Sequence, residues 1–83
     1  MSPLRRIEEE LARATKKYPP MNSAHEAYAF LLEEVDELWE EVKVKQSKHD
    51  YKAMRDECVQ IGAMAARFIR DVCDPKIETD LTL

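Results

Sequence analysis

The chain has 83 residues, which is enough for a single domain. It is 45% hydrophobic and 36% charged with one glycine, which excludes both a disordered chain and a sandwich of tightly turned strands. No apolar run approaches the roughly 18 residues of a membrane span, no signal peptide opens the chain, and the net charge of −4 argues against a nucleic-acid polymer as partner. We expect one all-α domain, 1–83, with its core at about 20–73. Because short chains bury little core, we expect this bundle to be completed by oligomerisation.

The first predicted helix follows Met1 and Ser2. Pro3 stands where a first helical turn tolerates proline, and Leu4, Ile7 and Leu11 form an apolar stripe at helical spacing. Pro19-Pro20 then ends the helix, because proline cannot continue it.

The second predicted helix is long and spans about 23–46. Ser23 and Glu26 have the spacing of a capping box, in which Glu26 reaches back to the start of the helix. Apolar residues then recur every three or four positions as far as Val42, and we expect Trp39 among them to pack in the core. Residues 47–50 form a polar turn that contains two candidate capping residues.

The third predicted helix runs from about 50 to 73 and ends at Asp74-Pro75, with 76–83 as a loose tail. Residues 58–66 contain one polar side chain, so this helix is apolar nearly all round. Three short helices cannot cover such a segment. We therefore expect partner subunits of the same chain, in a dimer or tetramer, to bury it.

Two cysteines lie in this third helix. Cys58 and Cys73 are 15 residues apart, roughly 22 Å along a helix, which is too far for a disulfide. We expect both to be reduced core residues, which is typical of a cytoplasmic protein.

Negative charge is concentrated in the second helix. Residues 26–41 carry seven acids and no Lys or Arg. Glu34 and Glu37 lie beside the apolar face, and Glu57 and Gln60 repeat their spacing on the third helix. If the two helices pack antiparallel, three carboxylates and an amide oxygen converge, as hard cations such as Mg²⁺ require. A solvated acidic face is the alternative.

Two polar residues of the third helix have open roles. Gln60 lies in the apolar run, so it either ligates a cation or makes a hydrogen bond to another helix or subunit. Arg67 either binds a phosphate or forms an ion pair with Asp71, four residues on.

Two segments together resemble a known family. They read NSAHEAYAFLLEEVDELWEEV at 22–42 and RDECVQIGAMAARF at 55–68. They resemble the MazG-like branch of the all-α nucleoside triphosphate pyrophosphohydrolases, which carries Glu-Glu-x-x-Glu on one helix and Glu-x-x-Asp on the next. The resemblance implies a helical bundle completed by dimer or tetramer formation. It also implies Mg²⁺-dependent cleavage of a nucleoside triphosphate to monophosphate and pyrophosphate, with Mn²⁺ as a possible substitute.

Site residues follow from this resemblance position by position. Glu34, Glu37 and Glu57 match the metal ligands. Glu34 also counts among the catalytic residues, and Glu33 would support catalysis or position a water. The family's Asp falls at Gln60, which can ligate a metal but brings no charge and cannot act as a base. Candidates for contact with the nucleotide are Arg67, Phe30, Tyr28, Tyr18 and His25.

Three interpretations remain at this point. The first is an active pyrophosphohydrolase. The second is a non-catalytic nucleotide-binding, metal-binding or regulatory oligomer on the same fold, which Gln60 favours. The third is a plain helical oligomerisation module whose acidic face is solvated.

Overall fold

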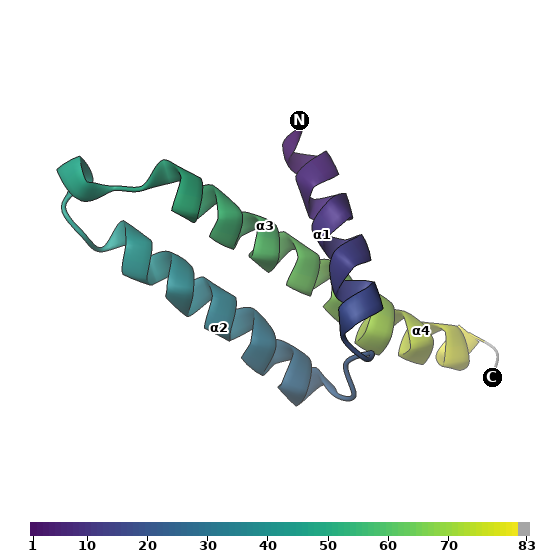
Figure 1. Cartoon of the computed structure of the whole chain (residues 1–83). Coiled ribbons are helices and arrows are strands. Elements are labelled where there is room, and N and C mark those ends of the chain that lie inside the picture. Colours follow the sequence, from purple (N-terminus) through teal and green to yellow (C-terminus); the bar gives the residue numbers. More distant parts are fainter. Residues whose placement is uncertain (82–83) are drawn as a thin grey trace.

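The structure, a computed structural model, describes residues 1–81 and is helical throughout (Figure 1). Its elements are α1 (Pro3–Lys17), α2 (Ala24–Val42), the 3-10 turn η1 (Gln46–Lys48), α3 (Tyr51–Phe68), the π-helical turn η2 (Ile69–Cys73) and α4 (Asp74–Leu81). Residues 1–81 contain no strand, which confirms the all-α prediction with its three long helices.

The helices α2 and α3 lie side by side and antiparallel, and α1 packs across α3 (Figure 1). Gly62 lies where α1 and α3 approach each other. A Cβ atom at this position would be 2.7 Å from Cδ1 of Ile7, so glycine leaves room for the α1 side chain. The central helix is α3, because α2 packs along one side of it and α1 packs across another.

Side-chain caps begin α2 and α3 as the sequence predicts. The Ser23 hydroxyl accepts a hydrogen bond of 3.1 Å from the backbone N–H of Glu26, and the Asp50 carboxylate accepts one of 3.0 Å from Ala53. The second half of the predicted capping box is wrong. The Glu26 carboxylate accepts a 3.3 Å hydrogen bond from the Asn22 side chain instead of reaching back to the Ser23 backbone.

The predicted end of the second helix, near residue 46, is also wrong, because α2 ends at Val42. His49 accounts for this earlier end. Its Nε2 lies 2.9 Å from the carbonyl oxygen of Val42 and 3.1 Å from that of Val44, carbonyls that a continuing helix would satisfy itself. The histidine side chain therefore closes the helix where the turn begins.

The structure likewise corrects the predicted stop at Asp74-Pro75. The backbone N–H of Asp74 bonds to the carbonyl of Ile69, five residues back, so the chain widens into the π-helical turn η2. The widening accommodates Pro75, which lacks the N–H of a regular α-helix and would crowd the preceding turn. The predicted loose tail at 76–83 is therefore helical to Leu81, and residues 82–83 lie outside the described part.

The single chain has a thin core. The buried apolar residues are all small or flexible: Ala14, Met21, Ala27 and Ala63. The radius of gyration is 14.9 Å, against about 12 Å for a compact domain of this length. Cys58 and Cys73 are free thiols, but the prediction of a core position is wrong for Cys58, which is exposed. None of the helices over residues 1–81 is long and apolar enough to cross a membrane.

The outer face of α2 carries an exposed apolar stripe. We call it the α2 stripe; it comprises Tyr28, Leu32, Val35, Trp39 and Val42, at alternating spacings of four and three residues. This is the spacing of a helix-pairing seam. Trp39 is 58% exposed, so the prediction that it packs in the core of the chain is wrong. The side of α2 that faces α3 carries other residues, among them the acidic ones of the candidate site.

Candidate metal centre and ligand pocket

Three glutamates from α2 and α3 converge, as the sequence predicts. Carboxylate oxygens of Glu34, Glu37 and Glu57 lie within 4.8 Å of one another. Glu34 and Glu37 share one face of α2 because they are three residues apart, and the antiparallel packing of α3 brings Glu57 opposite them. We call this group the carboxylate cluster.

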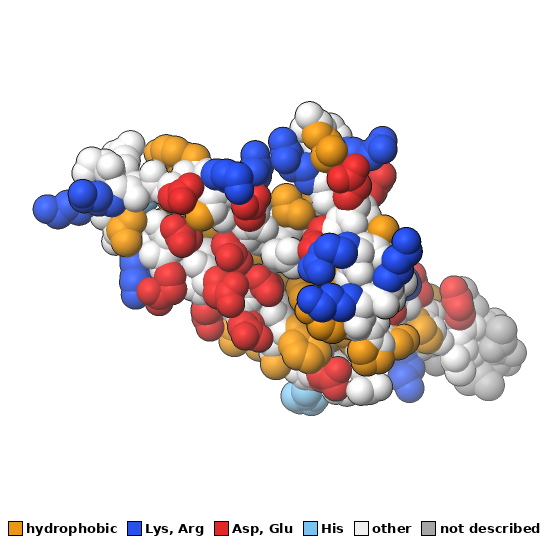
Figure 2. All heavy atoms as spheres, in the orientation of Figure 1, with side chains coloured by type: hydrophobic (Ala, Val, Ile, Leu, Met, Phe, Trp, Pro, Cys, Tyr) orange, Lys and Arg blue, Asp and Glu red, His pale blue; other side chains and the backbone are white. Residues whose placement is uncertain are grey.

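No Lys or Arg of the described part of the chain pairs directly with the carboxylate cluster. The ion pairs formed within residues 1–81 include none of its three members. Figure 2 shows acidic side chains gathered between α2 and α3, with Lys and Arg collected on the adjoining α1. Burial, a hydrogen bond to Glu57 and the charge of Glu37 together raise the pKa of Glu34 to about 7. Burial also raises the pKa of Glu57.

One oxygen of the carboxylate cluster is left without a partner. Oε2 of Glu57 is buried and makes no hydrogen bond to any of the described residues, which is costly for a carboxylate. A hard cation prefers oxygen ligands and would neutralise the repulsion between the three groups. The donor set and the unpartnered oxygen therefore fit a divalent cation such as Mg²⁺.

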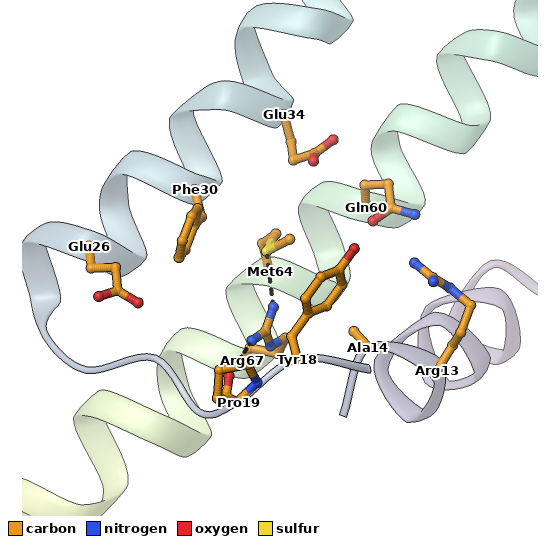
Figure 3. A pocket seen from close by; sticks show the side chains of 10 residues that line it. All are labelled: Arg13, Ala14, Tyr18, Pro19, Glu26, Phe30, Glu34, Gln60, Met64 and Arg67. Carbon is orange, nitrogen blue, oxygen red and sulfur yellow. Dashed lines mark hydrogen bonds between the residues drawn. The ribbon is translucent and has the colours of Figure 1, made fainter. Parts of the chain in front are cut away.

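A cavity of about 300 Å³ extends from the carboxylate cluster toward α1 (Figure 3), a size at the lower end of small-molecule pockets. Its wall combines carboxylate, cationic and aromatic side chains. They are Arg13, Ala14, Tyr18, Pro19, Glu26, Phe30, Glu34, Gln60, Met64 and Arg67. Five predicted site residues thus line one pocket: Tyr18, Phe30, Glu34, Gln60 and Arg67. Tyr28 and His25 are exposed and do not line it.

Arg67 lies at the base of this pocket and is only 4% exposed. Its Nη2 donates a 3.0 Å hydrogen bond to the Pro19 carbonyl, and its guanidinium carbon lies 5.8 Å from the centre of the Tyr18 ring. Its Nε has no hydrogen-bond partner among residues 1–81. A buried guanidinium with an unpartnered nitrogen is costly unless something else contacts it. A ligand in the pocket could make that contact.

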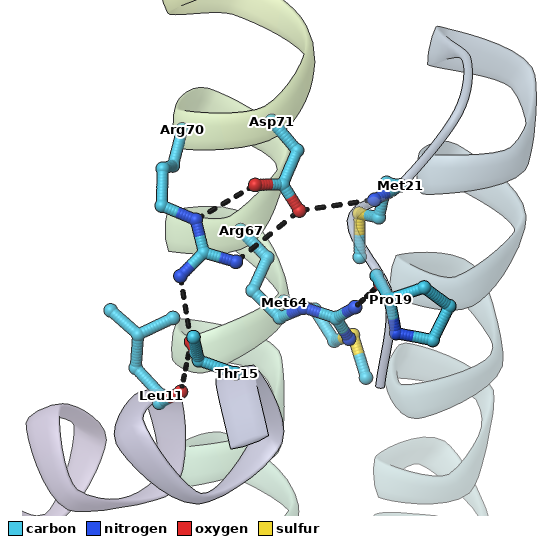
Figure 4. A network of polar contacts seen from close by, with 8 residues as sticks. All are labelled: Leu11, Thr15, Pro19, Met21, Met64, Arg67, Arg70 and Asp71. Atoms are coloured by element: carbon cyan, nitrogen blue, oxygen red, sulfur yellow. Dashed lines mark hydrogen bonds and ion pairs between the residues drawn. The ribbon is translucent and has the colours of Figure 1, made fainter. Parts of the chain in front are cut away.

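The alternative role for Arg67, an ion pair with Asp71, is wrong. The Asp71 carboxylate accepts a 2.7 Å hydrogen bond from Arg70 and a 3.0 Å hydrogen bond from the backbone N–H of Met21 (Figure 4). These contacts hold the pKa of Asp71 below its ordinary value, with Arg70 as the largest cause. Arg70 also donates to the Thr15 hydroxyl, so this network ties η2 to α1.

Glu33 lies outside the carboxylate cluster. It is exposed and borders a shallow depression with Asp36, Glu37 and Glu40. Successive helical residues point about 100° apart, so Glu33 and Glu34 cannot both face α3. A role for Glu33 in positioning water stays a prediction.

Gln60 makes the interhelical hydrogen bond that the sequence left as one of two roles. Its Nε2 donates a 2.7 Å hydrogen bond to Oε1 of Glu10 on α1. Glu10 and Arg13 also bear on the site and were not predicted from the sequence. The spacing of Ile7, Glu10 and Ala14 places Glu10 on the packed face of α1, and this was the available signal.

Comparison with protein-family models, with curated proteins and with solved structures finds no match for this chain. What supports a functional assignment is therefore the geometry of the site and the motifs in the two segments. The carboxylate cluster is suited to hold a cation. The pocket beside it adds two arginines and two aromatic rings, which suit a phosphorylated aromatic ligand.

Proposed function

We propose that the protein is a Mg²⁺-dependent nucleoside triphosphate pyrophosphohydrolase. The observation that carries the proposal is the junction of two features. The carboxylate cluster is built from two helices and forms no ion pair within residues 1–81. Through Glu34 it opens into a pocket whose wall contains arginine and aromatic side chains. A nucleoside triphosphate combines the groups that such a site contacts: phosphates for cations and an aromatic base for stacking.

Each part of the site has a role in this proposal. Glu34, Glu37 and Glu57 hold Mg²⁺, which when bound supplies charge neutralisation and orientation to the triphosphate. Tyr18 and Phe30 stack on the nucleobase, and Arg67 contacts the ligand at the bottom of the pocket. Water attacks the α-phosphorus, the bond from that phosphorus to the bridging oxygen breaks, and monophosphate and pyrophosphate leave. The proton of the water is released to solvent, because Glu33 is exposed and its side chain cannot face α3 together with that of Glu34.

Pyrophosphate release from the common nucleoside triphosphates, measured with and without Mg²⁺, tests this function. Glu57→Gln should lower the rate at least about 100-fold, because it removes a metal ligand. Glu40→Gln is the matched control, since Glu40 is exposed on α2 and forms a surface ion pair with Lys43. Absence of release from every triphosphate, or equal loss in both variants, would contradict the proposal.

A second function has one observation in its favour. Gln60 stands where the resembled family has Asp, and its amide N–H is already bonded to Glu10. With one carboxylate fewer, the chain could bind metal and nucleotide as a non-catalytic or regulatory oligomer. Nucleotide binding that depends on Mg²⁺, without pyrophosphate release, would select this function.

We also propose that a second copy of the chain covers the α2 stripe, as a dimer or as part of a tetramer. The thin core and the exposed seam both favour this. Trp39→Glu should dissociate the assembly, because a buried unpaired charge costs several kcal/mol. Sedimentation at micromolar concentration measures this, with Leu4→Glu as control because Leu4 is an exposed apolar residue outside the stripe. A wild-type monomer under these conditions would contradict the assembly.

A further inference from the structure

A partly buried ion pair within α1 lies beside the pocket. Glu10 is only 9% exposed and lies where α1 packs on α3. Nε of Arg13 lies 2.7 Å from each of its carboxylate oxygens, and Nε2 of Gln60 donates to Oε1, also at 2.7 Å. Despite burial, these contacts hold the pKa of Glu10 below its ordinary value, with Arg13 as the largest cause. The carboxylate is thus a fixed anion, held from both helices.

Arg13 is much more exposed than its partner Glu10. Its side chain remains 53% exposed and lines the same pocket as Glu34 and Arg67. Glu10 engages Nε and Nη2, while Nη1 has no hydrogen-bond partner within residues 1–81. The guanidinium is therefore anchored through Nε and Nη2, and its Nη1 donors remain available for a ligand. Figure 3 shows Arg13 extending from α1 toward the side of the pocket that Gln60 occupies.

The amide of Gln60 suits this arrangement better than a carboxylate would. An N–H donor at 2.7 Å stabilises the Glu10 carboxylate, whereas an aspartate there would place two like charges close together in a partly buried interface. Such repulsion would disturb Glu10 and release the anchored side of Arg13. The residue type at position 60 therefore affects where the arginine lies.

We propose that Arg13 binds a phosphate group of the ligand, and that Glu10 and Gln60 are positioning residues that hold its guanidinium at the pocket. The proposal rests on the proposed function and deepens it. Arg13 of α1 and Arg67 of α3 contact the ligand within the pocket, and the carboxylate cluster approaches it at Glu34. A guanidinium held along one edge keeps a rigid set of donors for phosphate oxygens, at a smaller entropic cost than a free side chain.

Titration of inorganic tripolyphosphate in the presence of Mg²⁺ tests Arg13 without requiring a base or hydrolysis. Arg13→Gln should weaken binding about 10- to 100-fold, the range expected for hydrogen bonds to a charged group. Arg5→Gln is the control, because it removes the same charge from α1 at an exposed pair with Glu9. Equal weakening in the two variants, or no binding by the wild type, overturns the proposal.

The positioning role needs a separate readout. Glu10→Gln and Gln60→Asp should each weaken tripolyphosphate binding while the affinity for the uncharged nucleoside stays the same. Arg13→Lys, which keeps the charge but not the guanidinium, should bind tripolyphosphate more weakly than the wild type. Glu10→Gln preserves volume, so it remains informative if Gln60→Asp does not fold. Unchanged tripolyphosphate affinity in the folded variants overturns the positioning role. Tripolyphosphate binding that depends on Arg13, without pyrophosphate release, would support this inference while the proposed function fails.

Discussion

Acidic residues on the two sides of α3 have opposite electrostatic surroundings. Toward α1 and the α1–α2 connection, Glu10 and Asp71 are paired with Arg13 and Arg70, and the pKa of each carboxyl is lowered. Toward α2, no Lys or Arg of residues 1–81 forms an ion pair with the carboxylate cluster, and the pKa of Glu34 is raised to about 7. The same chemical group thus contributes to the fold on one side and remains unneutralised on the other.

The difference follows from which segments supply cations. The first helix and the end of the third contain arginines that reach the carboxylates beside them, whereas 26–41 contains no Lys or Arg. Paired buried carboxylates are satisfied inside the fold. Clustered unpaired ones are stable only with a proton or an external cation, and this is why we assign the metal to the α2 side.

The largest expected effect is stabilisation by Mg²⁺ on the α2 side alone. A cation at about 100 times its Kd stabilises the folded state by about 2.7 kcal/mol, which corresponds to roughly 10 °C or more in Tm for a domain of this size. Glu34→Gln and Glu57→Gln should each remove most of this gain and leave the apo fold intact, because they relieve repulsion. Thermal unfolding with Mg²⁺ and with EDTA measures the difference.

Glu40→Gln serves as control and should retain the full response to Mg²⁺. If Mg²⁺ and Mn²⁺ leave the wild-type Tm unchanged, the carboxylate cluster is a solvated face and the chain is a plain helical module. If only Gln60→Asp creates a metal response, the family's fourth carboxylate is required, and the positioning role of Gln60 would also be in doubt.

Much of this site could be predicted from local patterns. The three-residue spacing of Glu34 and Glu37, with Glu57 on a helix expected to pack antiparallel, was enough to predict that these carboxylates converge. Such patterns depend on helical periodicity, which the sequence shows directly. Trp39 was misplaced because periodicity identifies an apolar face without showing whether the same chain or another covers it.

The parts that could not be predicted depend on the α1–α3 interface and on backbone detail. The bond between Gln60 and Glu10 joins residues 50 positions apart, and local spacing places Glu10 on the packed face of α1 without identifying Gln60 as its partner. The continuation past Pro75 depends on the π-helical turn η2, which widens the helix before the proline. The sequence therefore showed which residue types were present, but not which long-range partner each one found.

A smaller effect is expected on the side of α3 that faces α1, where Glu10 and Asp71 are paired with arginines. Asp71→Ala should destabilise the protein by about 1–3 kcal/mol, because it leaves the Met21 N–H and the Arg70 guanidinium without their acceptor in a part-buried position. The free energy of unfolding from urea denaturation measures this loss. Asp56→Ala is the control, with an expected change of at most about 1 kcal/mol, because its pairs with Lys52 and Arg55 are exposed. Equal losses would show that the Asp71 network adds nothing beyond a surface pair.

The smallest effect is a pH dependence that separates the two sides. The pKa of Glu34 rises from an ordinary 4.5 to about 7 on folding, so between these values the folded state binds more protons than the unfolded state. Its contribution to stability is therefore present at low pH and is lost as the pH rises through about 7, and Glu57 acts in the same direction. Glu10 and Asp71 behave oppositely, but their pKa values are lowered, so their contributions change only in acid.

Urea denaturation in EDTA at about pH 5.5 and about pH 8 isolates this contribution when the wild type is compared with Glu34→Gln, in which other titrating groups are unchanged. We expect the wild type to lose more stability than the variant as the pH rises, because glutamine mimics the protonated carboxyl and cannot ionise. Saturating Mg²⁺ should reverse the difference at the higher pH, since the cation then takes the place of the proton. An identical pH response of the two proteins in EDTA would mean that Glu34 titrates as an ordinary surface carboxylate, and the electrostatic contrast between the two sides of α3 would be lost.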